Sequence, residues 1–202
     1  MNKGAILPLF YLPPTEYFSS LIRHKENILI ECFEHFPKQT FRNRAVIQSP
    51  NGKLNLIVPV VKGSNAHTDM KDVKISYDFN WQRLHWMSLQ TSYRSSSYFE
   101  FYEDEFAVFY ENKWDFLFDY NEEMLRLLCK LLKLNISYNY TSSYEESYSA
   151  LEDQRNNIHP KNTSSHTARP YYQVFEDRNG FLPNLSIVDL LFSQGPQSHN
   201  YI

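Results

Sequence analysis

Residues 4–33, GAILPLFYLPPTEYFSSLIRHKENILIECF, decide the fold because they contain the pattern strand, helix, strand. Ala5–Leu7 is a short apolar strand, and Thr15 follows two prolines at a position where it can cap a helix. The segment after Thr15 has a helical apolar stripe, formed by Phe18, Leu21 and Ile22. Asn27–Phe33 is a second strand, and its continuous apolar character indicates burial on both faces. A strand, a helix and a strand within about 30 residues form a βαβ unit, which favours parallel pairing.

The remaining chain continues with both strand and helix patterns. Two strands flank the turn sequence PNG, a hairpin signal, within residues 45–60. Further strand patterns occupy residues 73–77, 135–144 and 171–175. Helical patterns occupy residues 80–94, 97–112, 115–134 and 185–195, and Gly195 is well placed to end the last helix. We expect an α/β fold, with α+β as the open alternative. A mixed β-sheet would come from the N-terminal half, and the middle and C-terminal sections would be mainly helical.

We expect residues 1–202 to form a single domain, because the sequence has no internal repeat and no second core pattern. Residues 145–168 are polar, contain one proline and have almost no apolar periodicity. The sequence therefore predicts a mobile loop there, within the domain and suited to act as a lid.

The composition excludes some classes of partner. The net charge of −3 gives no electrostatic reason to expect nucleic acid binding. The apolar runs are too short to cross a bilayer, and the N-terminus lacks a signal-peptide pattern, so we expect a soluble cytoplasmic protein without a membrane span. Cys32 and Cys129 lie in apolar segments and are expected to be free thiols.

No common catalytic signature is present. The chain has no GxSxG, Walker, HExxH, CxxC or GxGxxG motif. The seven histidines have no metal-ligand spacing, so we expect no metal site. The sequence assigns no cofactor and no oligomeric state.

The stretch KQTFRNR, Lys38–Arg44, is the first candidate site. In an extended segment Arg42 and Arg44 point to one face, which would suit a phosphate or a carboxylate. The alternative is that these arginines pair with local acids such as Glu31 or Glu34. Both interpretations remain open at this point.

Three further motifs contribute candidate residues. Lys62 follows a buried strand pattern and adds a third cation. Trp81 and His85 share a helix face, where His85 could serve as a general base or as a core residue. Asn184 precedes the last helix, which it or Ser186 can cap.

Taken together, these motifs resemble the WbqC-like protein family. The resemblance is carried by AILPLFYLPPTEYFSSL, by KQTFRNR with the hairpin and LIVPVVKGS, by DVKISYDFNWQRLHWMSLQTSYRSSSYFEFY and by YQVFEDRNGFLPNLSIVDLLFSQGP. These stretches occur in order over nearly the whole chain.

The resemblance implies a transferase of bacterial surface polysaccharide (O-antigen, lipopolysaccharide type) biosynthesis, with acyl or aminoacyl transfer to a sugar nucleotide as the reaction class. The implied partner is an anionic small molecule such as a sugar nucleotide or an acyl donor. His85 is the expected catalytic residue, and the expected anion- or substrate-binding residues are Lys38, Arg42, Asn43, Arg44, Lys62, Trp81 and Asn184. The alternative is a non-catalytic binding or accessory protein of polysaccharide assembly.

Overall fold

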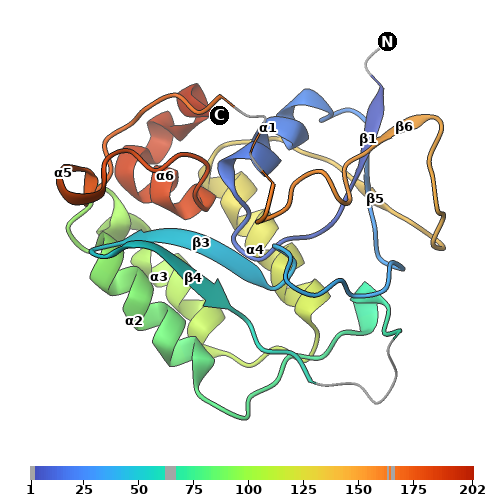
Figure 1. The fold of residues 1–202 in the computed structure, drawn as a ribbon, viewed down its shortest axis with the longest axis horizontal. Coiled ribbons are helices and arrows are strands. Elements are labelled where there is room, and N and C mark those ends of the chain that lie inside the picture. The colour runs from blue at the N-terminus through green and yellow to red at the C-terminus, as the bar shows by residue number, and fades with distance from the viewer. Residues whose placement is uncertain (1–2, 62–66, 163, 165–166) are drawn as a thin grey trace.

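The computed structural model describes residues 3–61, 67–162, 164 and 167–202. Its helices and strands confirm the predicted α/β class. Figure 1 shows the parallel strands on one side of the molecule and helices α2, α3 and α6 on the other. The bounds of α2, α3 and α6 are Trp81–Tyr93, Phe99–Glu111 and Ile187–Gln194.

A four-stranded parallel sheet has the order β5-β2-β1-β6. Its strands in chain order are β1 (Gly4–Leu7), β2 (Ile28–Ile30), β5 (Asn139–Tyr140) and β6 (Leu151–Asp153). Helix α1 (Thr15–Arg23) connects β1 to β2, and these two strands pair in parallel with Ala5 opposite Ile28. The predicted βαβ unit is therefore confirmed.

The hairpin forms a sheet of its own. Strands β3 (Arg44–Ser49) and β4 (Gly52–Ile57) pair in antiparallel register, with Ser49 opposite Gly52. Gly52 has φ +100°, a conformation that favours glycine at this turn. Instead of one mixed sheet from the N-terminal half, the protein has this hairpin and a parallel sheet that takes two of its strands from beyond residue 138.

The other elements are short except for α4. Helix α4 (Leu117–Leu131) buries the predicted leucine stripe, including Leu125 and Leu128. The remaining elements are the 3₁₀ helices η1 (Met70–Asp72) and η2 (Gly195–Tyr201) and the single-turn helix α5 (Glu176–Asn179). Residues 171–175 do not form the predicted strand, and residues 73–77 make only isolated bridges through Lys74 and Ile75. Apolar side chains of these two segments pack in the core, and their backbones form no continuous strand ladder.

One aromatic-rich core joins the elements. Its buried hydrophobic residues extend along the chain from Ala5 to Phe192. Helix α2 packs on α3 and β3, and α3 also packs on α4 and α6. The division into domains stays a prediction.

The segment after α5 ties the C-terminal part to the N-terminal part. The Ser186 amide donates to the Val46 carbonyl at 2.8 Å, and the Ile187 amide donates to the Pro13 carbonyl at 2.8 Å. Gly195 ends α6 as predicted, with φ +52°. A β-carbon there would lie 2.4 Å from the Tyr98 ring, so this position requires glycine.

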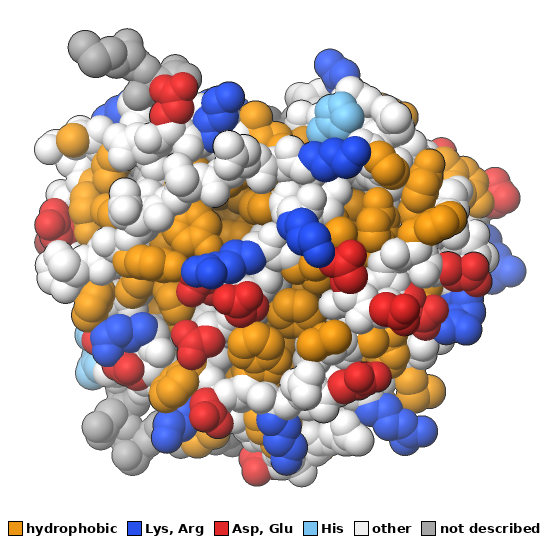
Figure 2. All heavy atoms as spheres, turned by 180° about the vertical axis from the view of Figure 1, so that it is seen from behind, with side chains coloured by type: hydrophobic (Ala, Val, Ile, Leu, Met, Phe, Trp, Pro, Cys, Tyr) orange, Lys and Arg blue, Asp and Glu red, His pale blue; other side chains and the backbone are white. Residues whose placement is uncertain are grey.

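No helix in the described part of the chain is both long enough and apolar enough to cross a membrane. Figure 2 shows the molecule from behind, where acidic and basic side chains alternate between apolar ones. This face therefore carries no large patch of a single charge sign.

Candidate functional site

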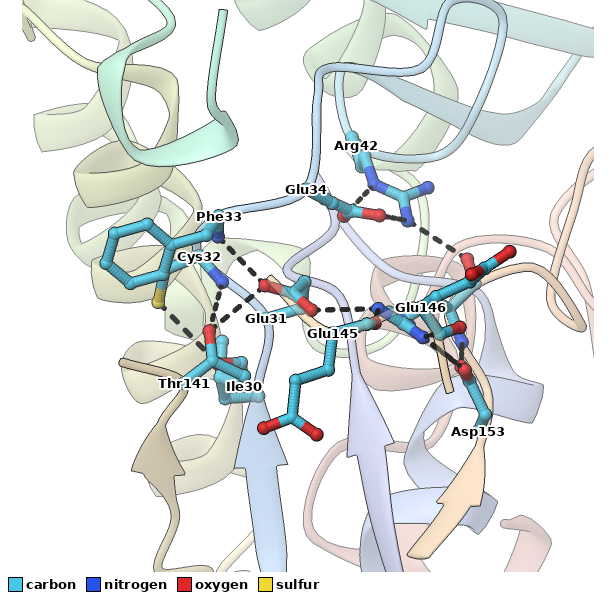
Figure 3. A network of polar contacts seen from close by, with 11 residues as sticks. Ile30, Glu31, Cys32, Phe33, Glu34, Arg42, Thr141, Glu145, Glu146 and Asp153 are labelled. Atoms are coloured by element: carbon cyan, nitrogen blue, oxygen red, sulfur yellow. Dashed lines mark hydrogen bonds and ion pairs between the residues drawn. The ribbon is translucent and has the colours of Figure 1, made fainter. Parts of the chain in front are cut away.

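A cleft of about 250 Å³ lies at the carboxyl edge of the parallel sheet, where α/β proteins commonly bind ligands. It is lined by Glu34, His35, Pro37, Tyr144, Arg155 and Asn156. Figure 3 shows polar side chains gathered beyond the ends of the strands, with the lining residue Glu34 among them. The segments that follow β2 and β6 supply most of them, because parallel strands all end at this edge.

Glu31 is the central carboxylate of this polar network. It follows β2 directly and is fully buried. Its Oε1 accepts hydrogen bonds from the Phe33 amide at 2.9 Å and from the Thr141 hydroxyl at 3.0 Å. Its Oε2 accepts from Arg155 Nη1 at 3.0 Å. Glu31 therefore connects the ends of β2, β5 and β6.

Arg155 uses all three guanidinium nitrogens within the protein. Besides Glu31, it binds the Asp153 carboxylate through Nε and Nη2 and the carbonyl oxygens of Glu145 and Glu146 at 2.8 and 3.1 Å. The guanidinium carbon also lies 5.2 Å from the ring centres of both Tyr144 and Tyr148. Asp153 raises the pKa of Arg155. Burial acts to raise the pKa of Asp153, but its interactions with Arg155 outweigh burial and lower that pKa. This guanidinium holds the loop before β6 against the sheet.

Arg42 forms a buried ion pair with Glu34. Its Nε and Nη2 donate to the two carboxylate oxygens of Glu34 at 2.5 and 2.7 Å. Nη2 also donates to the Arg155 carbonyl at 3.0 Å. Burial raises the pKa of Glu34, and the charge of Arg42 opposes that rise. The structure thus realises the alternative that the sequence left open for Arg42: a bidentate pair with a local acid, in place of a free anion-binding group.

The charge balance of the network follows from these pairs. It contains the carboxylates of Glu31, Glu34 and Asp153 and the guanidiniums of Arg42 and Arg155. With all five groups ionised it carries one net negative charge. The floor of the cleft therefore suits hydroxyl or amino groups better than phosphate.

Arg44 belongs to a separate basic cluster. It begins β3, and its Nε is buried without a hydrogen-bond partner in the described part of the chain. Burial, and then the positive charges of Lys161, Arg42 and Arg44, lower the pKa of His159. The charges of all three cations therefore act on this imidazole. We call Arg44, His159 and Lys161 the basic cluster.

His85 and Trp81 lie in an aromatic cluster and do not line the cleft. The His85 Nδ1 is 2.9 Å from the Tyr11 hydroxyl, and the Trp81 ring meets the His85 ring edge-on at 5.0 Å. Both side chains are buried, and burial lowers the pKa of His85 to about 4. His85 is therefore a neutral imidazole within the core, and its role as a catalytic base stays a prediction.

The other predicted site residues are dispersed. Asn43 donates from Nδ2 to the Val58 carbonyl at 2.9 Å and so fixes the end of the hairpin. Asn184 accepts from the Glu16 amide at 3.0 Å, which caps α1 and not the last helix. Ser186 caps α6 by accepting from the Val188 amide at 3.5 Å. Lys38 is exposed, and Lys62 lies outside the described residues.

Sequence reasoning missed Tyr144, Arg155 and Asn156, which line the cleft, and Asp153, which pairs with Arg155 in the polar network. All four lie in or beside residues 145–168, which the polar composition predicts to be a loop. The structure places β6 inside this segment and buries Arg155. The only local signal is Leu151–Asp153, a strand of three residues that is too short to recognise.

The comparisons with known proteins agree with the motifs. A model of the WbqC-like protein family matches residues 10–156. The chain belongs to this family. The matched range contains every residue that lines the cleft of this WbqC-like protein. An uncharacterized protein of Mycobacterium tuberculosis (strain ATCC 25618 / H37Rv) is 25% identical over 228 positions, which cover 100% of this chain and 98% of that protein. No solved structure matches significantly.

Proposed function

We propose that this WbqC-like protein is a transferase of bacterial surface polysaccharide biosynthesis, and that the cleft binds the sugar part of its substrate. The observation that carries the proposal is the position of the cleft at the carboxyl edge of the parallel sheet, above a network of buried charged side chains. The reaction class is acyl or aminoacyl transfer to the sugar of a sugar nucleotide, as the family resemblance implies.

The lining of the cleft supports a sugar ligand. Tyr144 is half exposed and presents an aromatic face, on which the apolar side of a sugar ring can stack. Glu34 and Asn156 offer oxygen and nitrogen atoms for hydroxyl groups. A volume of about 250 Å³ suits a single sugar ring better than a complete nucleotide sugar.

The basic cluster supports an anionic remainder of the substrate. Buried guanidinium nitrogens rarely lack a partner, and the buried Nε of Arg44 has none in the described part of the chain. Arg42 connects the two regions, since it pairs with Glu34 in the cleft and its charge acts on His159 in the basic cluster. A phosphate bound by Arg44 and Lys161 would therefore extend from the sugar in the cleft.

The test is a binding titration of sugar nucleotides followed by a transfer assay with acyl and aminoacyl donors. Tyr144→Ala should weaken sugar nucleotide binding about tenfold, which corresponds to about 1.4 kcal/mol. Tyr172→Ala is the matched control, because Tyr172 is 59% exposed and Tyr144 is 53% exposed, and Tyr172 lies outside the cleft.

Arg44→Ala should weaken the nucleotide but not the free sugar. Failure of every sugar ligand to bind, or equal loss in Tyr144→Ala and Tyr172→Ala, would refute the proposal. Tight binding without transfer of any group would favour the non-catalytic accessory role.

A further inference from the structure

Glu34 lines the cleft, whereas the other two acids of the polar network do not, within the part of the chain that the structure describes. Those two, Glu31 and Asp153, both pair with Arg155. The Glu34 side chain is almost fully buried beside its partner and faces the cleft with the small part that remains. A ligand in the cleft therefore meets a carboxylate that water scarcely reaches.

The carboxylate of Glu34 has unused capacity to accept hydrogen bonds. An ionised carboxylate can accept about four, two at each oxygen. Among the described residues, Arg42 alone donates to this carboxylate, with one hydrogen bond to each oxygen. The Asp153 carboxylate differs, because Arg155 donates twice to each of its oxygens. Glu34 therefore keeps room for donors from a ligand.

The charge of Glu34 is only partly compensated within the protein. Burial raises its pKa even though the charge of Arg42 opposes that rise. The ionised carboxylate is therefore less favourable in this position than in water. A cationic group of a ligand, bound in the cleft, would supply part of the missing compensation.

Arg155 also lines the cleft, but it does not oppose a cation there. Its guanidinium nitrogens donate to Glu31, to Asp153 and to two backbone carbonyls. Together with these two carboxylates, Arg155 forms a group that carries one net negative charge when all three are ionised. The charges beside the cleft therefore favour a ligand group that is positive and rich in hydrogen-bond donors.

We propose that the sugar bound in the cleft is an amino sugar, whose protonated amino group donates hydrogen bonds to the Glu34 carboxylate. This inference rests on the proposed function, since it requires that the cleft binds a sugar. An ammonium group has donors only and carries one positive charge, so it matches both the open acceptor positions and the charge of Glu34. Hydrogen bonds between charged groups are about twice as strong as neutral ones, so a hydroxyl group in the same position is the weaker ligand.

The experiment is a calorimetric titration of the full chain with glucose, galactose and mannose, free and as their nucleoside diphosphate conjugates. Each sugar is compared with derivatives in which one hydroxyl group is replaced by an amino group. Working at about pH 7 keeps the amine protonated, because the usual α-amino pKa is about 7.7 to 8. At least one amino derivative should bind about tenfold more tightly than its parent sugar.

Glu34→Gln keeps the shape of the side chain and removes its charge. The preference for the amino derivative should disappear in this variant. Glu103→Gln is the matched control, because Glu103 also pairs with an arginine, Arg94 at 2.6 Å, but lies on α3 and does not line the cleft. The preference should persist in Glu103→Gln, and thermal melting checks that both variants retain the fold.

The inference is overturned if the wild type binds the parent sugars as tightly as all their amino derivatives, or if the preference survives in folded Glu34→Gln. Should Glu34→Gln not fold, the wild-type comparison decides alone, because it needs no substitution. Equal binding of amino and hydroxyl forms would remove the amino sugar and leave the proposed function standing. Absence of binding by every sugar would instead refute the proposed function itself.

Discussion

The buried pair of Arg42 and Glu34 allows a quantitative test of whether this arginine is structural. The side chains are 1% and 9% exposed. Replacing Arg42 by methionine leaves the Glu34 carboxylate without its bidentate partner, and such a loss costs about 3 to 5 kcal/mol. For a chain of 202 residues this corresponds to a fall in Tm of about 6 to 20 °C.

A double-mutant cycle separates the pair from other effects of Arg42. In Arg42→Met/Glu34→Leu no charge remains unpaired at this position, so the double variant should be more stable than Arg42→Met by about 2 kcal/mol. Lys38→Met is the matched control in the same loop, because Lys38 is exposed, and it should change stability by less than about 0.5 kcal/mol. Unfolding in urea, followed by circular dichroism, measures the free energies of the wild type, of the single variants Arg42→Met and Glu34→Leu, of the double variant and of Lys38→Met.

The pH dependence gives a second readout of the same pair. Burial raises the pKa of Glu34, and Arg42 is the largest opposing cause, so the pKa should rise further in Arg42→Met. A carboxyl whose pKa is raised by folding contributes stability at low pH, and that contribution is lost as the pH increases. The loss of unfolding free energy in Arg42→Met, relative to the wild type, should therefore be smaller at pH 4.5 than at pH 8. The first pH lies near the usual glutamate pKa of about 4.3, and the second lies well above it. If Arg42→Met lost less than about 0.5 kcal/mol of unfolding free energy at pH 8, the structural role of Arg42 would be refuted.

Three further outcomes are expected. His85→Phe should lower the free energy of unfolding without changing sugar nucleotide affinity in a calorimetric titration, because His85 contacts Tyr11 and Trp81 and not the cleft; lost transfer activity in a fully stable variant would contradict this. Burial raises the pKa of Asp189 to about 6, so the stability advantage of the wild type over Asp189→Asn should fall by about 2 kcal/mol between pH 4 and pH 7, as pH-dependent urea unfolding would show. Limited proteolysis should cut residues 145–168 first, and ligand should slow the cut; first cleavage within α2 or α3 would count against mobility of this loop.

The sequence predicts the local parts of the fold well. The βαβ unit, the hairpin and the long helices all follow from periodicity within single segments. Asn80 caps α2 as its position before the helix suggests, with its side chain accepting from the Arg83 amide. These features depend on neighbours within a few residues, and local patterns record them directly.

The cleft depends on contacts that no local pattern records. Glu31 meets Arg155, which is 124 positions away in the chain. The core likewise joins distant residues, since Tyr11 meets His85, which is 74 positions away. Arg42 and Arg44 stand two residues apart, yet one is paired with Glu34 and the other has a buried Nε without a partner in the described part of the chain. The same charge in the sequence therefore has two different environments, and only the tertiary structure distinguishes them.

The order of the strands has a consequence for synthesis of the protein on the ribosome. Strand β1 is central, but Gly4 pairs with Leu151 of β6, so this side of β1 lacks its partner until most of the chain has been made. At about 5 to 20 residues per second, the roughly 120 residues between β2 and β6 take about 6 to 25 seconds to translate. During that interval the nascent chain exposes an apolar strand with unpaired backbone groups, which is a template for aggregation. We therefore expect the emerging chain to be more prone to aggregation before β6 has been made than after it.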